Sequence, residues 1–186
     1  MAVTTINLLQ GPAIARVAPF GSIEPVKGPT AATVAPDPVW IDIGGTTDGV
    51  TVNISQEYSE MEVDQLVDTP ESRLTKRGFT IETNMAEATL ANLKLSLNGG
   101  ALADGEFEPA DVDSATRPDY MAIMLDGPGE GGLPRRFIGR KLLSVEGTEF
   151  AYEKEDQQVF TVTLRGHYVS KSIRPFRVIN AQPAVV

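Results

Sequence analysis

The chain has 186 residues, of which 41% are hydrophobic and 22% are charged, and its formal net charge is -9. This length fits one domain with a substantial core and is too short for two ordinary domains with linkers. No stretch approaches the roughly 20 apolar residues of a membrane helix, and the first ten residues lack the basic region of a signal peptide, so we expect no membrane association. The absence of cysteine excludes disulfides, thiolate nucleophiles and cysteine-based zinc sites.

The charge is divided unevenly along the chain. Residues 40–130 have 18 acidic against five basic side chains, a balance of -13, whereas residues 131–186 have nine basic against five acidic ones, a balance of +4. Such a division fits a solvated surface that keeps the protein soluble, and it also fits copies that attract one another through oppositely charged surfaces. Sequence-specific nucleic-acid binding is not expected, because no basic stripe is present.

Residues 1–38 are rich in proline and glycine. Proline removes a backbone donor and restricts the residue before it, so a long helix is excluded here. We predict an extended N-terminal arm over residues 1–38, in which a short apolar run at residues 13–17 could add an edge strand. The prolines are Pro12, Pro19, Pro25, Pro29, Pro36 and Pro38.

A long β-hairpin is predicted next. Residues 39–43 read as a strand, the glycines at 44–49 as a tight turn, and residues 50–63 as a long strand in which Val50, Val52 and Ile54 alternate with polar residues. The change of parity after Tyr58 predicts a bulge near Ser59 or Glu60. An acidic connection at 64–71 and a returning strand at 74–83 complete the hairpin, whose tip we place at residues 64–74.

One amphipathic helix is predicted over residues 85–97. Asn84 is expected as its N-cap with Glu87 completing a capping box. The spacing of four apolar residues predicts a single buried face, and Gly99 and Gly100 end the helix. The four residues are Ala86, Leu90, Leu93 and Leu97.

Three further strands and an edge strand follow an acidic connection at 101–117. We predict strands at 120–125, which is apolar on both faces and therefore central, at 137–145 and at 159–169; Pro175 makes 173–179 an edge strand. The order predicts a mainly β fold with one helix. We divide the chain into the arm at 1–38 and one β domain at 39–186.

No motif indicates catalysis, a cofactor or a metal. Residues 42–46 resemble a phosphate-binding segment of sugar kinases in the actin-like ATPase superfamily, but the chain is too short for two lobes and has no P-loop. The acidic residues at 104–113 do not form an EF-hand ligand set. His167 is the only histidine, so neither an ordinary zinc site nor a serine triad is expected. We predict that the protein is not an enzyme.

Several short motifs in one order resemble the major tail (tail tube) proteins of long-tailed bacteriophages. The resemblance covers residues 39–100 well and the remainder only in strand order. It rests on Trp40-Ile41-Asp42-Ile43-Gly44, Thr47-Asp48-Gly49-Val50, Tyr58, Val63-Asp64-Gln65, Thr80-Ile81-Glu82-Thr83 and Ala86-Glu87-Ala88-Thr89-Leu90.

The resemblance implies a β-sandwich or barrel-like tail tube fold with one flanking helix. It implies a structural virion protein whose homo-hexameric rings stack into the tail tube, the conduit for DNA ejection. It implies as partners other copies of the chain and the tape measure, tail terminator and tail initiator proteins, with DNA passing through the lumen without specific binding. It implies a place in the virion tail, after assembly in the host cytoplasm. The alternative is a β-sandwich carbohydrate-binding or adhesion module that uses Trp40, Tyr58 and Tyr120.

The resemblance also suggests which residues make contacts between subunits. The ring-stacking loop would comprise Asp64, Asp68, Pro70, Glu71, Arg73 and Leu74. The N-terminal arm would contribute Arg16 and Phe20, and the C-terminal contact would comprise Arg174, Phe176 and Arg177.

Overall fold

The structure is a computed structural model that describes residues 8–25, 39–62, 64, 67–110, 117–152, 154 and 157–181. These residues form antiparallel β-strands, one α-helix and one short 3-10 helix, which confirms the predicted mainly β fold class. No helix in this part of the chain is long and apolar enough to cross a membrane.

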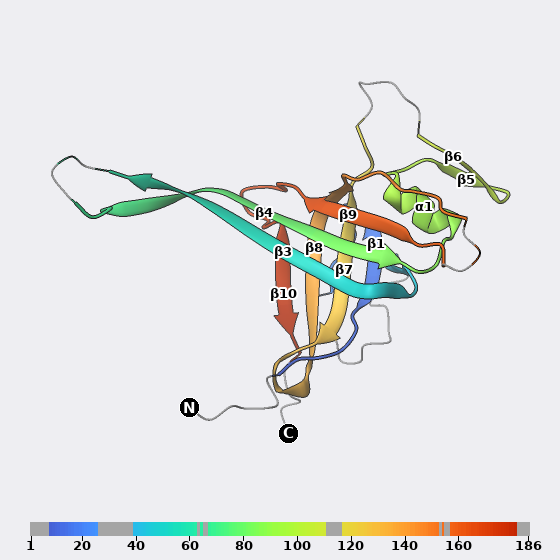
Figure 1. The fold of residues 1–186 in the computed structure, drawn as a ribbon, viewed down its shortest axis with the longest axis horizontal. Coiled ribbons are helices and arrows are strands. Elements are labelled where there is room, and N and C mark those ends of the chain that lie inside the picture. The colour runs from blue at the N-terminus through green and yellow to red at the C-terminus, as the bar shows by residue number, and fades with distance from the viewer. Residues whose placement is uncertain are drawn as a thin grey trace.

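The strands form one sheet that is folded over into two layers (Figure 1). The first layer has the order β2-β1-β7-β8, with β10 also paired to β8, and the second has the order β9-β4-β3. The layers are joined where the last residues of β8, Leu142–Ser144, pair with β9. The strands are β1 (Ile14–Pro19), β2 (Ile41–Asp42), β3 (Thr46–Met61), β4 (Glu71–Met85), β7 (Met121–Pro128), β8 (Pro134–Ser144), β9 (Phe160–Gly166) and β10 (Phe176–Asn180).

Three small elements lie outside this sheet. The helix α1 (Leu90–Ser96) follows β4, and the small hairpin of β5 (Ala101–Ala103) and β6 (Glu106–Glu108) lies next to it. The 3-10 turn η2 (Glu130–Gly132) connects β7 to β8.

The main hydrophobic core lies between the two layers. In β4, Phe79, Ile81 and Met85 alternate with more exposed residues and face the core, as period-two alternation requires of a strand with one buried face. The ring of Phe79 meets Phe137 of β8 and Phe176 of β10 edge to face, with centroids 5.9 and 5.4 Å away. These contacts fix how the second layer lies on the first.

Strand β7 is buried on both faces, as its continuous apolar run predicts. Ile123 and Leu125 face the main core, whereas Ala122 and Met124 belong to a second apolar cluster on the opposite face of the layer. Trp40 closes this second cluster and donates its indole N–H to the carbonyl of Ile23 at 3.0 Å. The prediction of a central strand at 120–125 is therefore confirmed.

Within the described N-terminal residues 8–25, residues 14–19 belong to the sheet as β1. β1 lies between β2 and β7, and its Arg16 is buried. Asp126 of β7 accepts hydrogen bonds from Arg16 at 3.0 Å and from Arg136 of β8 at 2.6 and 2.7 Å. A buried carboxylate shared by two guanidinium groups fastens three adjacent strands together. The strand that was expected at the sheet edge over residues 13–17 is β1, which is paired on both sides.

The helix is shorter than predicted because β4 continues through Met85. Thr89, and not Asn84, is the N-cap, and its side chain accepts from the amide of Asn92. Glu87 accepts instead from the amide of Gly45 at 3.1 Å. Of the predicted buried face only Leu93 is buried, since Leu90 and Leu97 are exposed and Ala86 is only partly buried.

Replacing Leu93 with alanine should destabilise the protein, because Leu93 is the helix residue that belongs to the main core. The expected loss in free energy of unfolding is about 2–5 kcal/mol, the range for a buried leucine. Urea unfolding measures it, with Leu90→Ala on the exposed side of α1 as the matched control. A loss below about 1 kcal/mol for Leu93→Ala would show that the helix does not close the core.

The other predicted strands differ from the structure mainly at their ends. The strand predicted at 39–43 is only the two-residue β2, and the bulges of the hairpin fall between Thr47 and Val50 and between Glu57 and Tyr58. β10 begins three residues later than predicted and pairs with β8, as expected of an added edge strand. Gly166 ends β9 against the ring of Phe79, where a Cβ would have no room.

Candidate assembly surfaces

The β3–β4 hairpin projects far beyond the two-layered body (Figure 1). β4 pairs with β9 only from Thr80 to Met85, whereas β3 and β4 continue to pair with each other as far as Met61 and Glu71. Every described side chain in residues 53–62 and 67–77 is exposed. We name residues 55–77 the projecting hairpin.

One face of the projecting hairpin continues the apolar face of the core. Residues directly opposite one another in an antiparallel pair share a face. The pairs Ile54–Phe79 and Tyr58–Leu74 lie on this face, with the polar pair Gln56–Arg77 between them. Phe79 is buried, but Ile54, Tyr58 and Leu74 are 45%, 56% and 38% exposed. The core-facing side of the hairpin therefore presents large apolar side chains beyond the point where its own second layer ends.

The opposite face of the projecting hairpin is charged. Glu57 and Lys76 form an exposed ion pair at 2.8 Å, which contributes little to stability because water and salt screen it. The bulge next to Glu57 is held by Thr75, whose hydroxyl donates to the Glu57 carbonyl at 3.0 Å. Acidic residues exceed basic ones by six to three over residues 55–77.

A two-stranded ribbon of this length is at best marginally stable alone in water. β3 also ends the sheet, so its outer edge has no strand beside it in the part of the chain that the structure describes. Long exposed edges of this kind are templates for pairing with another chain. The hairpin is therefore an element whose geometry is suited to contact with a second molecule.

The predicted stacking residues all lie on the projecting hairpin and all are exposed. Asp64, Asp68 and Pro70 lie in the connection, but Glu71, Arg73 and Leu74 belong to β4 and pair with Met61, Ser59 and Tyr58. The predicted tip at 64–74 is thus shorter in the structure, because strand pairing extends to Glu71. Residues 63, 65 and 66 lie outside the described residues.

The predicted arm and C-terminal contacts divide into buried and exposed residues. Arg16 lies in the buried ion cluster, and Phe176 stacks on Phe137 with centroids 5.6 Å apart, so these two belong to the protomer's own interior. Phe20 is 44% exposed, and Arg174 and Arg177 are exposed. Residues 1–7, 26–38 and 182–186, which include the rest of the predicted arm, lie outside the described residues.

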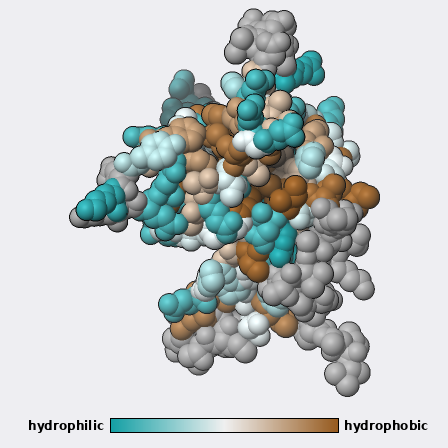
Figure 2. Space-filling view, turned by 90° about the vertical axis from the view of Figure 1, so that its right-hand side faces the viewer, coloured by the Kyte–Doolittle hydropathy of each residue, from teal (hydrophilic) through white to brown (hydrophobic). Residues whose placement is uncertain are grey.

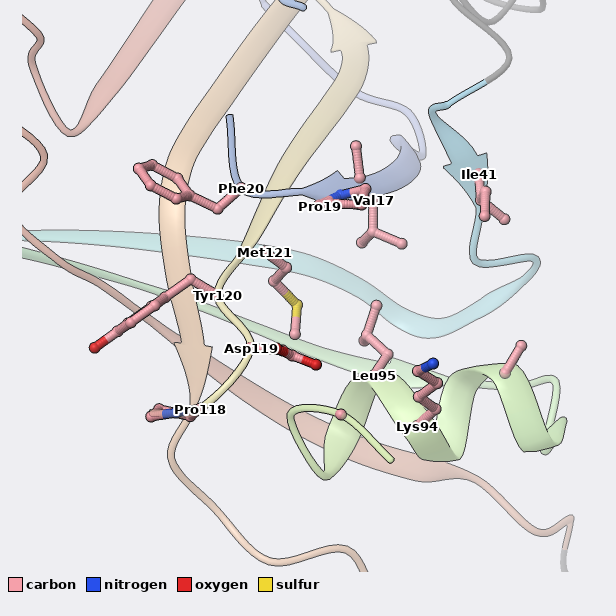
Figure 3. A pocket seen from close by; sticks show the side chains of 13 residues that line it. Val17, Pro19, Phe20, Ile41, Lys94, Leu95, Pro118, Asp119, Tyr120 and Met121 are labelled. Atoms are coloured by element: carbon pink, nitrogen blue, oxygen red, sulfur yellow. The ribbon is translucent and has the colours of Figure 1, made fainter. Parts of the chain in front are cut away.

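A cleft that the sequence did not indicate lies between β1 and α1, with a volume of about 570 Å³ (Figure 3). Val17, Pro19 and Ile41 line one side, and Lys94 and Leu95 of α1 line the other. Phe20, Asp119, Tyr120 and Met121 complete the wall. The cleft brings together side chains from segments that are up to about a hundred residues apart in the chain.

The aromatic wall of the cleft holds a lysine. The Lys141 ammonium lies 4.2 Å from the ring centroid of Tyr120 and 5.5 Å from that of Phe20, at cation–π distance. His167 packs edge to face on Tyr120, and burial, followed by the charges of Lys141 and Arg165, lowers the pKa of His167. Its imidazole is therefore neutral at neutral pH, and the cation at this wall is Lys141.

Comparison with known proteins gives distant structural matches only. No protein-family model and no curated protein matches the chain. A chain in the cryo-EM structure of the anti-feeding prophage (AFP) baseplate, 6-fold symmetrised, is similar, with a TM-score of 0.46 and 12% sequence identity. The alignment covers 98% of this chain and 100% of that chain. A likeness at this level does not identify the family or role of the chain.

The kinase-like segment at residues 42–46 is a structural turn. The amide of Gly44 donates to the carboxylate of Asp42 at 2.9 Å, and the amide of Gly45 donates to Glu87. Acidic side chains of the protein itself therefore hold these two amides, and negative charge at this position would repel a phosphate.

The cleft could not be predicted from periodicity, because its lining comes from segments that are distant in the sequence and meet only in the folded chain. Phe20 was predicted as a contact residue, but nothing in the sequence places it next to Tyr120 or opposite α1. Ile41 was assigned to a strand, and in the two-residue β2 its side chain is 63% exposed.

Proposed function

We propose that this chain is a structural subunit of a phage-type tail, which self-assembles into stacked hexameric rings that form the tail tube. The observation that supports it most is the projecting hairpin, whose exposed apolar side chains lie in line with the core and face no layer of their own protomer. An element that is marginal alone becomes stable when a neighbouring copy supplies the missing contact.

The polarity of the molecule supports assembly that propagates. The hairpin projects from one end of the body, and α1, β5 and β6 lie at the other (Figure 1). A contact between two different surfaces of the same chain is heterologous, and such contacts generate rings when the rotation closes and filaments when it does not. A tube of stacked rings needs both kinds of contact.

The charge distribution fits this role. The central acidic part of the chain and the basic C-terminal third attract one another between copies. On this proposal the protein is not an enzyme, its partners are its own copies and the other tail proteins that the sequence resemblance implies, and it resides in the virion tail. DNA passes through the lumen without specific binding.

The alternative of a carbohydrate-binding or adhesion module has less support. Trp40, one of its three proposed aromatic residues, is 2% exposed in the second apolar cluster. Tyr58 lies on the projecting hairpin, and Tyr120 contacts Lys141 and His167 at the cleft. Trp40 therefore offers no face on which a sugar ring could stack.

Sedimentation of the purified full chain tests the proposal. We expect the mean sedimentation coefficient to rise with protein concentration, through ring-sized to larger species. We expect association to weaken between low salt and 1 M salt, where the Debye length falls to about 3 Å. A single monomeric species at all concentrations and salts, also in the presence of the cognate tail initiator, would contradict self-assembly.

A further inference from the structure

We propose that the cleft between β1 and α1 receives the projecting hairpin of the next copy in the assembly. This inference rests on the proposed function and names the receiving surface that the proposed function leaves undefined. The occupant is a second copy of this chain, through the apolar face of its hairpin.

Position favours this pairing of surfaces. The hairpin extends away from the body on the side opposite α1, so the cleft of one copy can face the hairpin of another when copies follow head to tail (Figure 1). Figure 2 looks at the end of the molecule opposite the hairpin and shows hydrophobic surface near the middle of this face, between hydrophilic regions. A protomer that had both surfaces at one end would close into a pair and would not propagate.

Shape and chemistry also match. The cleft is concave and lined largely by apolar side chains, whereas the hairpin projects from the body and presents Tyr58 and Leu74 as exposed apolar groups on one face. A volume of about 570 Å³ lies within the usual 300–1,000 Å³ of binding clefts and accommodates large side chains from a ribbon tip. Aromatic anchors that enter a pocket are the typical centres of protein interfaces.

Charge is complementary at the rim. Lys94 lines the cleft, Lys141 lies against its aromatic wall, and Arg117 precedes Pro118 of its lining, whereas Asp119 is the acidic residue of the lining. The projecting hairpin has an excess of acidic residues over residues 55–77. Opposite charges around an apolar centre favour the acidic hairpin as the occupant. The cleft of another copy is less favoured, because it would place lysine next to lysine.

Cysteine crosslinking tests the contact directly, because the natural chain has no cysteine. The full-length double variant Leu74→Cys/Ile41→Cys is assembled and treated with a short bismaleimide, and denaturing gels are read for a ladder of linked copies. The matched control is Leu74→Cys/Val178→Cys, since Val178 is exposed on β10 and marks the other surface that a hairpin could cover. We expect the ladder with Ile41→Cys and unlinked chains with Val178→Cys.

A charge reversal gives an independent measurement. Lys94→Glu should raise the protein concentration needed for assembly by at least about tenfold, because it sets a carboxylate against the acidic hairpin. Lys154→Glu, an exposed lysine outside the cleft lining, makes the same charge change and should leave that concentration unchanged.

The outcomes separate this inference from the proposed function. Tubes that form but crosslink through Val178, or through neither cysteine, overturn the cleft as the receiving surface and leave the tail-tube role intact. Equal effects of the two lysine reversals overturn it in the same way. Loss of assembly on Ile41→Cys alone supports the cleft contact, whereas an unmodified chain that never assembles overturns the proposed function and this inference together.

Discussion

Shortening the projecting hairpin is expected to abolish assembly while leaving the protomer folded. Residues 58–75 are replaced by Asn-Gly, a two-residue turn that connects Glu57 directly to Lys76, which it faces across the strands. All core residues of β3 and β4 are retained, since every described side chain in the removed segment is exposed. The free energy of unfolding should change by less than about 1 kcal/mol, as for surface changes elsewhere.

Point variants identify the face that makes the contact. Tyr58→Ser/Leu74→Ser removes the apolar face of the hairpin, whereas Glu57→Ala/Lys76→Ala removes the exposed ion pair on the other face. Sedimentation should show lost assembly for the first pair and near-normal assembly for the second. Normal tubes from the shortened variant, or an unfolded protomer, would exclude the hairpin as the assembly element.

Replacing Asp126 with alanine is expected to cause the largest loss of protomer stability. The substitution removes the carboxylate that accepts from Arg16 and Arg136, and all three residues are buried. Breaking a buried ion pair by removing one partner costs about 3–5 kcal/mol, because charge is left in a poorly solvated place. Urea unfolding measures the loss.

Two further variants show how much of the stability loss comes from removing the charge of Asp126 and how much from removing its side chain. Asp126→Asn keeps the size and one acceptor oxygen, so it should lose less stability than Asp126→Ala. Glu24→Gln weakens the pair that Glu24 makes with Arg140 in a partly exposed position, and its effect should be smaller still. A loss below about 1 kcal/mol for Asp126→Ala would mean that the cluster does not fasten β1 to the sheet.

Periodicity was sufficient for the elements whose burial is regular. The alternation at Val50, Val52 and Ile54 and the continuous apolar run at 121–125 each correspond to a strand, although Ile54 is exposed where β3 leaves the body. A strand buried on one face has alternating apolar and polar residues, and a strand buried on both faces has a continuous apolar run.

The N-terminal strand was expected only as an edge strand, and its buried place between β2 and β7 could not be predicted because it depends on distant partners. Arg16 reads as a surface residue in isolation, since arginine is seldom fully buried unless it is paired. Its partner Asp126 lies 110 positions away in the chain, and only the return of β7 beside β1 brings the two together. Sequence spacing contains no trace of that contact.

The start of the helix was misjudged because two local signals competed. Asn84 and Glu87 have the spacing of a capping box, but Phe79, Ile81, Thr83 and Met85 continue the alternation of a strand, and each is buried. The strand prevails because β9 pairs with β4 as far as Met85. Because strand pairing extends to Met85, the helix begins later and its N-cap is Thr89.

The C-terminal contact residues were only partly separable by sequence. Phe176 and Arg177 are neighbours on β10, so their side chains lie on opposite faces, one toward Phe137 and one toward solvent. The alternation predicts that they differ, but which of the two is buried depends on the layer that covers β10.

Electron microscopy of the concentrated full-length chain tests self-assembly most directly. Negatively stained samples and two-dimensional class averages should show rings with six-fold end views and hollow tubes of constant diameter, and the hairpin-shortened chain prepared in parallel should show neither. Fields of single small particles from the unmodified chain at every concentration, also beside its tail initiator, would contradict the account.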